Sequence, residues 1–358
     1  MSGTTGPVPS FAGYQSVIGH LQSALPHNGT RTSLITSIIP SLLHSIAQIA
    51  QILRDSHVIS AQGTANSFGD DQLNVDVLAE NAIRAAIQHY CPSVITASSE
   101  EHPAETPVPG DHHGPDPSTS EQYTLAFDPL DGSSIIPSNW AVGTIIGLWD
   151  GTTALNQAPA TKQVAAILGV YGPRTTAVLA IRLPGSASKG ICLELALATS
   201  SPGGSGGHTE TWTVSNPNLS LATSSSGPKT RYFSPANLRA ASSDPAYSSL
   251  ISGYIQHEYT LRYSGGLVPD LVHALVKGHG IYLSPVTPNH KAKLRRLYEL
   301  LPVALVMECA GGKAVDEKDG TAILEREVKG EDERGGIVCG TEAEVEKAME
   351  VLLGKGSE

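Results

Sequence analysis

FDPLDGSS is the sequence of residues 127–134, and the alternating run YTLAF at residues 123–127 leads into it. Alternation of this kind predicts a β-strand, which the proline and the glycine of the stretch are expected to end. Asp128 and Asp131 lie three residues apart at that strand end. Two carboxylates at this spacing, with an intervening backbone carbonyl, can reach a single hard cation such as Mg²⁺.

The second half of the same stretch suits a phosphate. Gly132, Ser133 and Ser134 offer unobstructed N–H groups and two hydroxyls. The stretch can therefore hold a metal ion and a phosphate side by side, as the hydrolysis of a phosphoryl group requires.

The bulk composition sets wider limits. With 358 residues the chain is long enough for one large domain or two packed domains, and 40% hydrophobic residues support a substantial core. The net charge of −11 argues against nucleic acid as a partner. It does not exclude an anionic substrate, because a metal ion or a few basic side chains can reverse the field in one cleft.

Several features of the sequence indicate the cellular location of the protein. The four cysteines show no zinc-like spacing, so we expect free thiols in a reducing compartment. Residues 1–10 lack the basic and apolar segments of a secretory signal, and no uninterrupted apolar run approaches the length of a membrane span. The sequence therefore predicts a cytoplasmic protein that does not interact with membranes.

On both sides of residues 123–134, the sequence predicts a mixture of helices and strands, a pattern that is typical of a layered α/β fold. Residues 1–30 are polar and are expected to be loosely ordered. Helical spacing predicts a helix at 31–54, which Pro40 should kink or divide, and another at 76–90. Strands are expected at 94–97, 123–127, 143–149, 163–171, 175–182 and 190–198.

A segment rich in Gly, Ser, Thr and Pro, residues 199–228, is interpreted as a long mobile loop and as the boundary region. It divides the chain into an N-terminal subdomain, 31–228, and a smaller α/β subdomain, 229–358. In the latter we expect helical segments near 244–257, near 268–277, over 293–310 and near 342–353, and a strand at 280–284.

Carboxylates gather at three ends of predicted elements: Asp70 with Asp71 and Asp76, Glu100 with Glu101, and Asp128 with Asp131. Acids brought together without a cation would repel one another and become protonated. Two or three Mg²⁺ ions would relieve that repulsion and create a site for phosphoryl transfer. Further along, Glu299 and Glu308 are equally plausible additions to such a site.

Beyond these residues the sequence resembles the fructose-1,6-bisphosphatase family. The stretch at 128–134 carries the likeness to the family as a whole. NSFGDDQL at 66–73, VGTIIG at 142–147, YGPRTT at 171–176, YTLRYSGGLVPD at 259–270 and KAKLR at 291–295 resemble its sedoheptulose-1,7-bisphosphatase branch. The resemblance covers roughly residues 57–350 and implies a layered α-β-α-β-α sugar phosphatase fold, with mixed sheets flanked by helices and two packed subdomains.

The resemblance also implies roles for individual residues. The metal ligands would be Glu100, Asp128, Asp131, Glu299 and the backbone carbonyl of Leu130, binding two or three Mg²⁺ ions, with Mn²⁺ as the other candidate ion. Here the family pattern selects Glu299 over Glu308. Asp76 and Glu101 would orient and deprotonate the attacking water, and Asp70 would lie on a loop that closes over the site.

The substrate would be held by residues of both subdomains. Gly132, Ser133 and Ser134 would bind the phosphate that leaves, with Arg295 near it. Asn237, Tyr263 and Lys293 would bind the distal phosphate, together with Arg262 from a neighbouring subunit, which implies a homodimer or homotetramer.

One difference from the family pattern concerns the choice of sugar substrate. Fructose-specific members place a tyrosine on the strand before the substrate lysine, where this chain has Ser284. The resemblance therefore favours sedoheptulose 1,7-bisphosphate, hydrolysed to sedoheptulose 7-phosphate. Fructose 1,6-bisphosphate or dual specificity is the alternative, and a catalytically silent sugar-phosphate sensor is a second. An inositol-phosphate phosphatase is disfavoured by the segments suited to a second phosphate.

Overall fold

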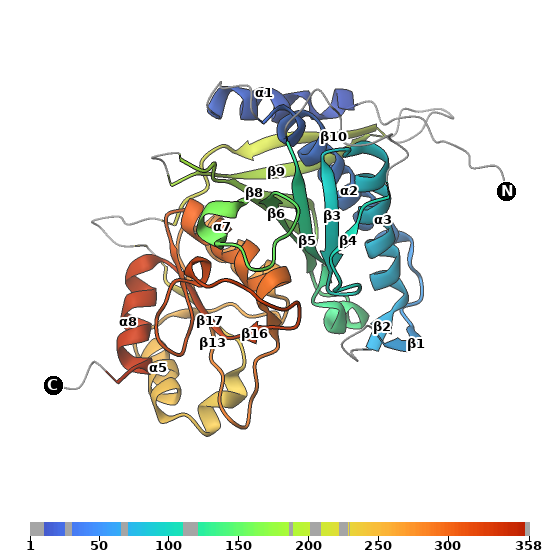
Figure 1. Cartoon of the computed structure of the whole chain (residues 1–358). Coiled ribbons are helices and arrows are strands. Elements are labelled where there is room, and N and C mark those ends of the chain that lie inside the picture. The colour runs from blue at the N-terminus through green and yellow to red at the C-terminus, as the bar shows by residue number, and fades with distance from the viewer. Residues whose placement is uncertain are drawn as a thin grey trace.

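The computed structural model describes residues 11–25, 31–65, 71–109, 121–185, 189–200, 209–221, 228 and 230–354. At its centre is a sheet of eight strands in the order β10-β9-β8-β7-β6-β5-β3-β4 (Figure 1). Neighbouring strands are antiparallel except β3 and β5, which are parallel. The strands are β3 (Val94–Ser99), β4 (Thr106–Pro107), β5 (Tyr123–Asp131), β6 (Val142–Asp150), β7 (Gln163–Tyr171), β8 (Thr175–Ile181), β9 (Ile191–Ser200) and β10 (Thr209–Asn216).

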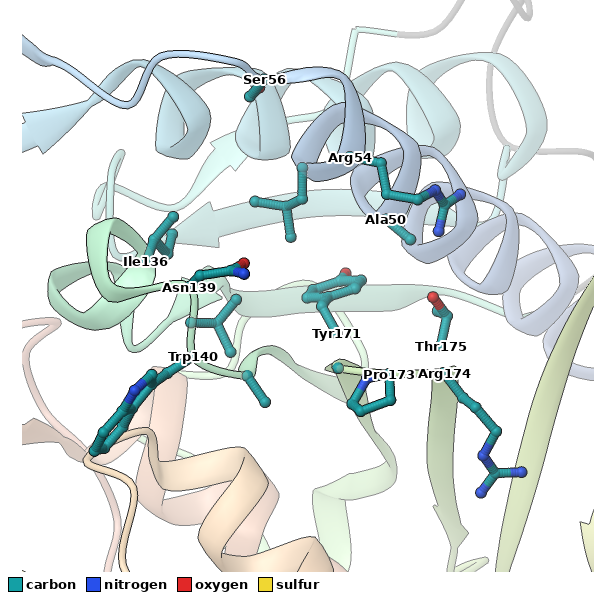
Figure 2. A pocket seen from close by; sticks show the side chains of 14 residues that line it. Ala50, Arg54, Ser56, Ile136, Asn139, Trp140, Tyr171, Pro173, Arg174 and Thr175 are labelled. Carbon is teal, nitrogen blue, oxygen red and sulfur yellow. The ribbon is translucent and has the colours of Figure 1, made fainter.

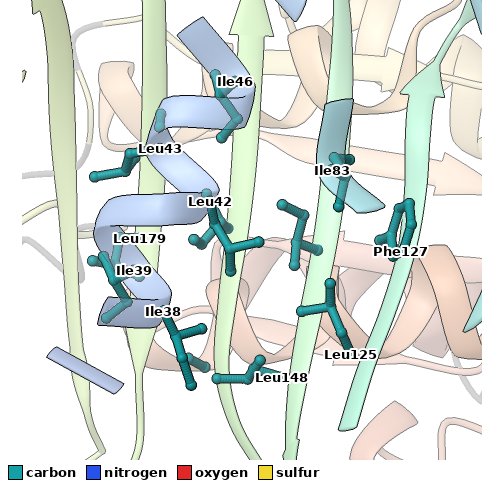
Figure 3. Packing of buried hydrophobic residues seen from close by; sticks show 14 of the residues in the cluster. Ile38, Ile39, Leu42, Leu43, Ile46, Ile83, Leu125, Phe127, Leu148 and Leu179 are labelled. Carbon is teal, nitrogen blue, oxygen red and sulfur yellow. The ribbon is translucent and has the colours of Figure 1, made fainter. Parts of the chain in front are cut away.

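Helices from the first part of the chain cover one face of this sheet. They are α1 (Gln15–Ala24), which lies over β10, and the mutually packed α2 (Ile39–Asp55) and α3 (Asn74–Tyr90). Ile38, Leu42 and Ile46 recur at the spacing of one helical face and are fully buried or nearly so. They belong to one apolar cluster with Leu148 and Leu179 of the sheet (Figure 3).

The opposite face of the sheet packs against α6 (Leu267–Lys277) and α7 (Leu301–Cys309). Beyond them lies a second sheet in the order β12-β11-β13-β17-β15. Its other face is covered by α5 (Pro245–Gln256) and α8 (Glu342–Leu352). Its strands are β11 (Tyr232–Pro235), β12 (Thr260–Leu261), β13 (Ile281–Ser284), β15 (Lys313–Val315) and β17 (Ile337–Gly340). The predicted α-β-α-β-α layering is confirmed.

Short elements complete the chain. Two small antiparallel pairs are β1 (Ala61–Ala65) with β2 (Asp71–Leu73) and β14 (Leu294–Arg295) with β16 (Arg334–Gly335), and α4 (Pro159–Lys162) is a single turn. Tighter 3₁₀ turns lie at Phe11–Tyr14, Ser133–Ser138, Leu238–Ser242 and Ile323–Glu325, and wider π turns at Leu34–Ile38 and Arg296–Leu300.

Most predicted elements of the N-terminal half are confirmed, but the first long helix is not divided at Pro40. The π turn at Leu34–Ile38 runs directly into α2, and this wider turn just before Pro40 accommodates the proline without a break in the helix. By length and composition the segment Leu34–Asp55 would also suit a membrane span, yet it is mostly buried inside the fold.

Three predictions about local structure were wrong. Residues 15–24 of the supposedly loose N-terminus form α1, because Val17 and Leu21 bury their side chains in the core. Within the supposed loop 199–228, Thr209–Asn216 forms the edge strand β10, anchored by the buried Trp212. An edge strand needs few apolar residues, so its polar composition was misleading.

The third error concerns the opening stretch itself. β5 does not end at the proline but continues to Asp131, with a register irregularity against β6 between Asp128 and Asp131. Proline is tolerated in a strand at such an irregularity because no ladder hydrogen bond is required there. The irregularity sets the geometry of the two carboxylates.

Candidate active site

Three buried carboxylates meet where β5 ends. Oxygens of Asp128, Asp131 and Glu299 all lie within 4.8 Å of one another. Glu299 comes from the π turn that leads into α7, so it joins the site from a part of the chain that is far from Asp128 and Asp131 in the sequence. Three carboxylate oxygens at this separation form a donor set that suits a hard divalent cation.

Asp131 is held by the start of α6. Its two carboxylate oxygens accept hydrogen bonds from the backbone N–H of Leu267 (3.2 Å) and of Val268 (2.7 Å). A helix N-terminus favours negative charge, so it stabilises this buried carboxylate. Gly143 of β6 makes the approach possible, because a Cβ there would lie 2.4 Å from the Val268 Cβ.

Asp128 is fixed within its own turn. Its Oδ1 accepts the Leu130 N–H at 2.9 Å. The Thr144 hydroxyl donates to the Pro129 carbonyl at 2.8 Å, and the Tyr171 hydroxyl lies 2.6 Å from the Thr144 oxygen. Because Thr144 has a single hydroxyl proton, Tyr171 must be the donor to Thr144. A directed chain of hydrogen bonds thus positions the turn between the two aspartates.

The pKa values of these acids are displaced upward. Burial raises the pKa of Asp131 to about 7, and raises the pKa values of Asp128 and Glu299 well above their usual range. The nearby charge of Glu100 adds to the shift in all three, since like charges disfavour ionisation. A bound cation would remove this repulsion, so the site fits a metal on its electrostatics as well as its geometry.

Glu100 and Arg295 form a partly buried contact at the same place. A guanidinium nitrogen of Arg295 donates to Glu100, and the Arg295 backbone N–H donates to Glu299. Arg295 is almost fully buried. The predicted metal ligands Glu100 and Glu299 are therefore brought together with Arg295. Glu308, by contrast, pairs with Arg182 at 2.6 Å and is not part of the acidic group.

The predicted water-activating acids lie beside this group. Asp76 stands in the first turn of α3, where its Oδ2 accepts the Leu73 N–H at 2.8 Å while its buried Oδ1 has no hydrogen-bond partner among the described residues. Burial raises its pKa to about 7, and the charges of Glu101 and Glu100 contribute. Burial also raises the pKa of Glu101, which accepts a hydrogen bond from Gln72. Asp70 lies outside the described residues.

The phosphate stretch adopts the conformation that its glycine permits. Gly132 has a φ of 83°, in the left-handed region, and starts the 3₁₀ turn that carries Ser133 and Ser134. A Cβ on Gly132 would lie 3.2 Å from the Cα of Gly266. The close approach of the two glycines brings the stretch next to the segment that contains Arg262 and Tyr263.

Comparison with known proteins gives two matches that together span most of the chain. Residues 16–195 match the family model described as the N-terminal domain of fructose-1,6-bisphosphatase, and residues 227–353 match its C-terminal domain. The chain belongs to the fructose-1,6-bisphosphatase family. It is therefore a phosphoric monoester hydrolase.

Relatives within the family carry two names. Chloroplastic sedoheptulose-1,7-bisphosphatase of Triticum aestivum is 38% identical over 300 residues, which cover 82% of this chain and 68% of the relative. Class 1 fructose-1,6-bisphosphatase of Geobacter sulfurreducens is 34% identical over 332 residues, covering 88% and 93%.

Solved structures of the family agree with the fold. A Toxoplasma gondii protein assigned as a sedoheptulose-1,7-bisphosphatase has a TM-score of 0.79 at 32% identity, covering 95% of this chain and 99% of that one. The holo form of Leishmania major fructose-1,6-bisphosphatase has a TM-score of 0.73 at 27% identity, covering 96% and 99%.

The residues predicted for the distal phosphate lie in the C-terminal half. Asn237 donates its amide to the Pro285 carbonyl at 2.7 Å, against the segment that leads to the exposed Lys293. Tyr263 is 45% exposed, and the Arg262 guanidinium lies 5.6 Å from the centre of the Tyr232 ring at the surface. These side chains are accessible to a ligand or to a second subunit.

Sequence reasoning assigned no role to Asp270, which links the two parts of the site. Its carboxylate accepts the N–H groups of Ser264 (2.7 Å) and Gly265 (3.3 Å). It thereby ties the segment after Arg262 and Tyr263 to α6, the helix whose first N–H groups hold Asp131. Asp270 stands in the first turn of the helix predicted near 268–277, and an acid at that position was the sequence signal that could have identified it.

Proposed function

We propose that this phosphatase removes the 1-phosphate of sedoheptulose 1,7-bisphosphate in a Mg²⁺-dependent reaction, giving sedoheptulose 7-phosphate and inorganic phosphate. The observation that carries the proposal is the buried acidic group of Asp128, Asp131 and Glu299 beside the glycine-serine turn at 132–134. Hydrolysis of a sugar bisphosphate follows from the family. The choice of sugar and of ion is the proposal.

The proposed metal ligands are Glu100, Asp128, Asp131, Glu299 and the Leu130 carbonyl. A bound cation would neutralise the phosphate and the departing alkoxide and lower the pKa of a coordinated water. The N–H groups and hydroxyls of Gly132, Ser133 and Ser134 hold the phosphate. Water then attacks the phosphorus in line with the sugar C1 oxygen, and that oxygen leaves with the sugar and takes up a proton.

Asp76 and Glu101 would orient this water and accept its proton. The pKa of Asp76, raised to about 7, suits a general base near neutral pH. Asn237, Tyr263, Lys293 and the Arg262 of a neighbouring subunit would bind the distal phosphate, while Arg295 lies by the reacting one. Binding of the distal phosphate orients the sugar and supplies binding energy away from the reacting atoms.

Ser284 supports the seven-carbon substrate. It lies at the end of β13, half-buried, where a tyrosine would take up more of the sugar pocket. Measured side by side, kcat/KM should be higher for sedoheptulose 1,7-bisphosphate than for fructose 1,6-bisphosphate. A preference for the fructose compound above about tenfold, roughly 1.4 kcal/mol in transition-state binding, would replace the proposal with fructose-1,6-bisphosphatase activity.

The choice of ion and the requirement for catalysis are tested in the same assay. Phosphate release should need added Mg²⁺ after treatment with EDTA, and Mn²⁺ is the comparison ion. If the wild-type protein releases no phosphate from either sugar bisphosphate with either ion, the proposed reaction is wrong, and a catalytically silent sugar-phosphate sensor is the alternative to test.

A further inference from the structure

A second cavity lies away from the acidic group, between the end of α2, the turn that joins β7 to β8 and the segment after the phosphate stretch (Figure 2). It has a volume of about 630 Å³. Cavities of about 300–1,000 Å³ are the usual size for small organic ligands, and an inorganic ion alone would fill little of this one.

The charge of the cavity is opposite to that of the chain. Its only charged lining residues among those described are Arg54 and Arg174, and no acidic side chain lines it, although the chain carries a net charge of −11. In Figure 2 the two arginines lie toward the same end of the cavity, on either side of Thr175. The two guanidinium groups point in different directions in Figure 2, but both side chains are exposed and can turn toward Thr175, so that end can supply the donors that a phosphate group requires.

These arginines also differ from most others in the described residues, which pair with carboxylates, as Arg31 does with Asp150 and Arg182 does with Glu308. Arg54 donates only to the neutral Gln51 side chain. The Arg174 side chain is exposed, and its guanidinium makes no hydrogen bond or ion pair within the described part of the chain, although its carbonyl accepts the Gly172 N–H at 3.3 Å. Both guanidinium charges are therefore available to an anionic ligand.

The rest of the wall suits the uncharged part of such a ligand. Asn139 directs its amide into the cavity, toward the Tyr171 ring (Figure 2). Trp140 lies at the rim of the cavity, where its ring extends away from Tyr171 (Figure 2), and it is 54% exposed, so an apolar ring is open to a ligand at the rim. An amide that can donate and accept, next to an indole face, suits the hydroxyls and carbon skeleton of a sugar.

We propose that this cavity is a second, non-catalytic binding site for a small phosphorylated metabolite of sugar-phosphate size. Arg54 and Arg174 bind the phosphate group, and Asn139 and Trp140 contact the sugar. The ligand would rest on the segment that directly follows Ser133 and Ser134, and on Tyr171, whose hydroxyl begins the chain of hydrogen bonds to Pro129.

Ribose 5-phosphate is a suitable probe, with full-length protein in EDTA. The chain has three tryptophans, of which Trp149 and Trp212 are fully buried. Acrylamide quenching of fluorescence therefore reports mainly on Trp140. We expect saturable protection of Trp140 by ribose 5-phosphate and none by neutral ribose, and calorimetry should give two molecules bound per chain, one in the catalytic site.

The double variant Arg54→Ala/Arg174→Ala should lose protection of Trp140, with an affinity lower by about tenfold or more, and bind one molecule per chain. The variant Lys162→Ala/Lys277→Ala removes the same charge elsewhere and should behave as the wild type. Both pairs are exposed, so unchanged phosphatase activity without added ligand verifies folding, and Arg174→Gln alone gives a milder test. Equal protection and stoichiometry in the wild type and the Arg54/Arg174 variant, or no protection in the wild type, would overturn the proposal.

Discussion

Glu299 illustrates how a single side chain acquires its role from its surroundings. It lies with Asp128 and Asp131 within 4.8 Å, whereas Glu308, in the same helical region, pairs with Arg182. Both glutamates are surrounded by apolar residues in the sequence. What distinguishes them is that the π turn at Arg296–Leu300 points Glu299 toward the end of β5, while Glu308 lies near the end of α7.

Glu299→Gln should therefore lower kcat/KM by about 10²-fold or more, because it removes one carboxylate from the proposed metal site. Its matched control is Glu308→Gln, which should leave kcat/KM unchanged and lower stability by about 1 kcal/mol or less through loss of a partly exposed ion pair. Steady-state phosphate release and thermal unfolding measure the two effects. A large loss of activity in Glu308→Gln would contradict the assignment.

The buried acids also predict how stability depends on pH. Asp76 and Asp131 have a pKa of about 7 in the folded protein, against 3.8 as the ordinary value. Between these values the folded state holds protons that the unfolded state has released, so their stabilising contribution is complete below about pH 4 and is lost as the pH rises through about 7. The melting temperature of metal-free protein should fall between about pH 5 and pH 8.

Mg²⁺ should reverse this trend, raising the melting temperature more at pH 8 than at pH 5, since it binds the ionised carboxylates. Asp128→Asn should raise the melting temperature of metal-free protein at pH 8 by removing one repelling charge, and should abolish activity. A metal-free melting temperature that rises from pH 5 to pH 8 in the wild type would show that the acids are not packed as described.

At the scale of elements, the site depends on how closely α6 crosses β6. The N–H groups of Leu267 and Val268 reach Asp131 because Gly143 has no side chain. A strand residue with a Cβ at this position would meet Val268, which is fully buried and has no room to move. The close packing of β6 against α6 thus depends on the contact between Gly143 and Val268.

Gly143→Ala should lower stability by about 1–3 kcal/mol and reduce activity, because the new methyl group pushes α6 away from Asp131. Gly19→Ala is the contrasting change, on the exposed side of α1 with nothing within 4 Å of the new Cβ. It should raise stability by about 0.5–1 kcal/mol and leave activity unchanged. Chemical denaturation of both variants gives the comparison, and a neutral Gly143→Ala would refute the close crossing.

The sequence predicted the elements of the N-terminal half better than the shorter ones of the C-terminal half. Repeated apolar spacing identified α2, α3 and the long strands from β5 to β9, since each buries a regular face. β11, β12, β15 and β17 were not predicted, because strands of two to four residues are mostly too short to show a period; β13, which is equally short, was predicted at 280–284. β10 was missed because its outward residues are polar.

At the scale of the whole molecule, the distal phosphate site raises the question of assembly. Arg262 is exposed, with the exposed apolar side chains of Leu261 and Tyr263 on either side of it in the chain. Apolar side chains of this size at a surface suit a contact with another protein. We expect a symmetric homodimer, or a homotetramer built from such pairs, in which each subunit supplies Arg262 to the site of its partner.

Mixing two inactive variants tests this arrangement. Arg262→Ala lacks the residue offered to the partner, and Asp128→Asn lacks the metal site, so each should be poorly active alone. Refolded together in equal amounts, they form mixed dimers with one complete site each, and activity should return to about a quarter of the wild-type value. Light scattering that finds only a monomer, or a mixture no more active than its parts, would refute the dimer.

The sequence by itself determined the chemistry at the end of β5: two aspartates, a left-handed glycine and two serines are contiguous, so their relation depends only on local backbone geometry. Apolar periodicity also predicted a mixed α/β fold in layers, whereas the α-β-α-β-α order was implied by the resemblance to the family. The tertiary structure alone decided that α6 donates to Asp131 across 136 residues and that Arg54 and Arg174 share a cavity. The residues alone left Glu299 and Glu308 equally plausible; the family resemblance selected Glu299, and the structure places it with the acids. These contacts depend on strand register and layer packing, which join residues that no local pattern relates.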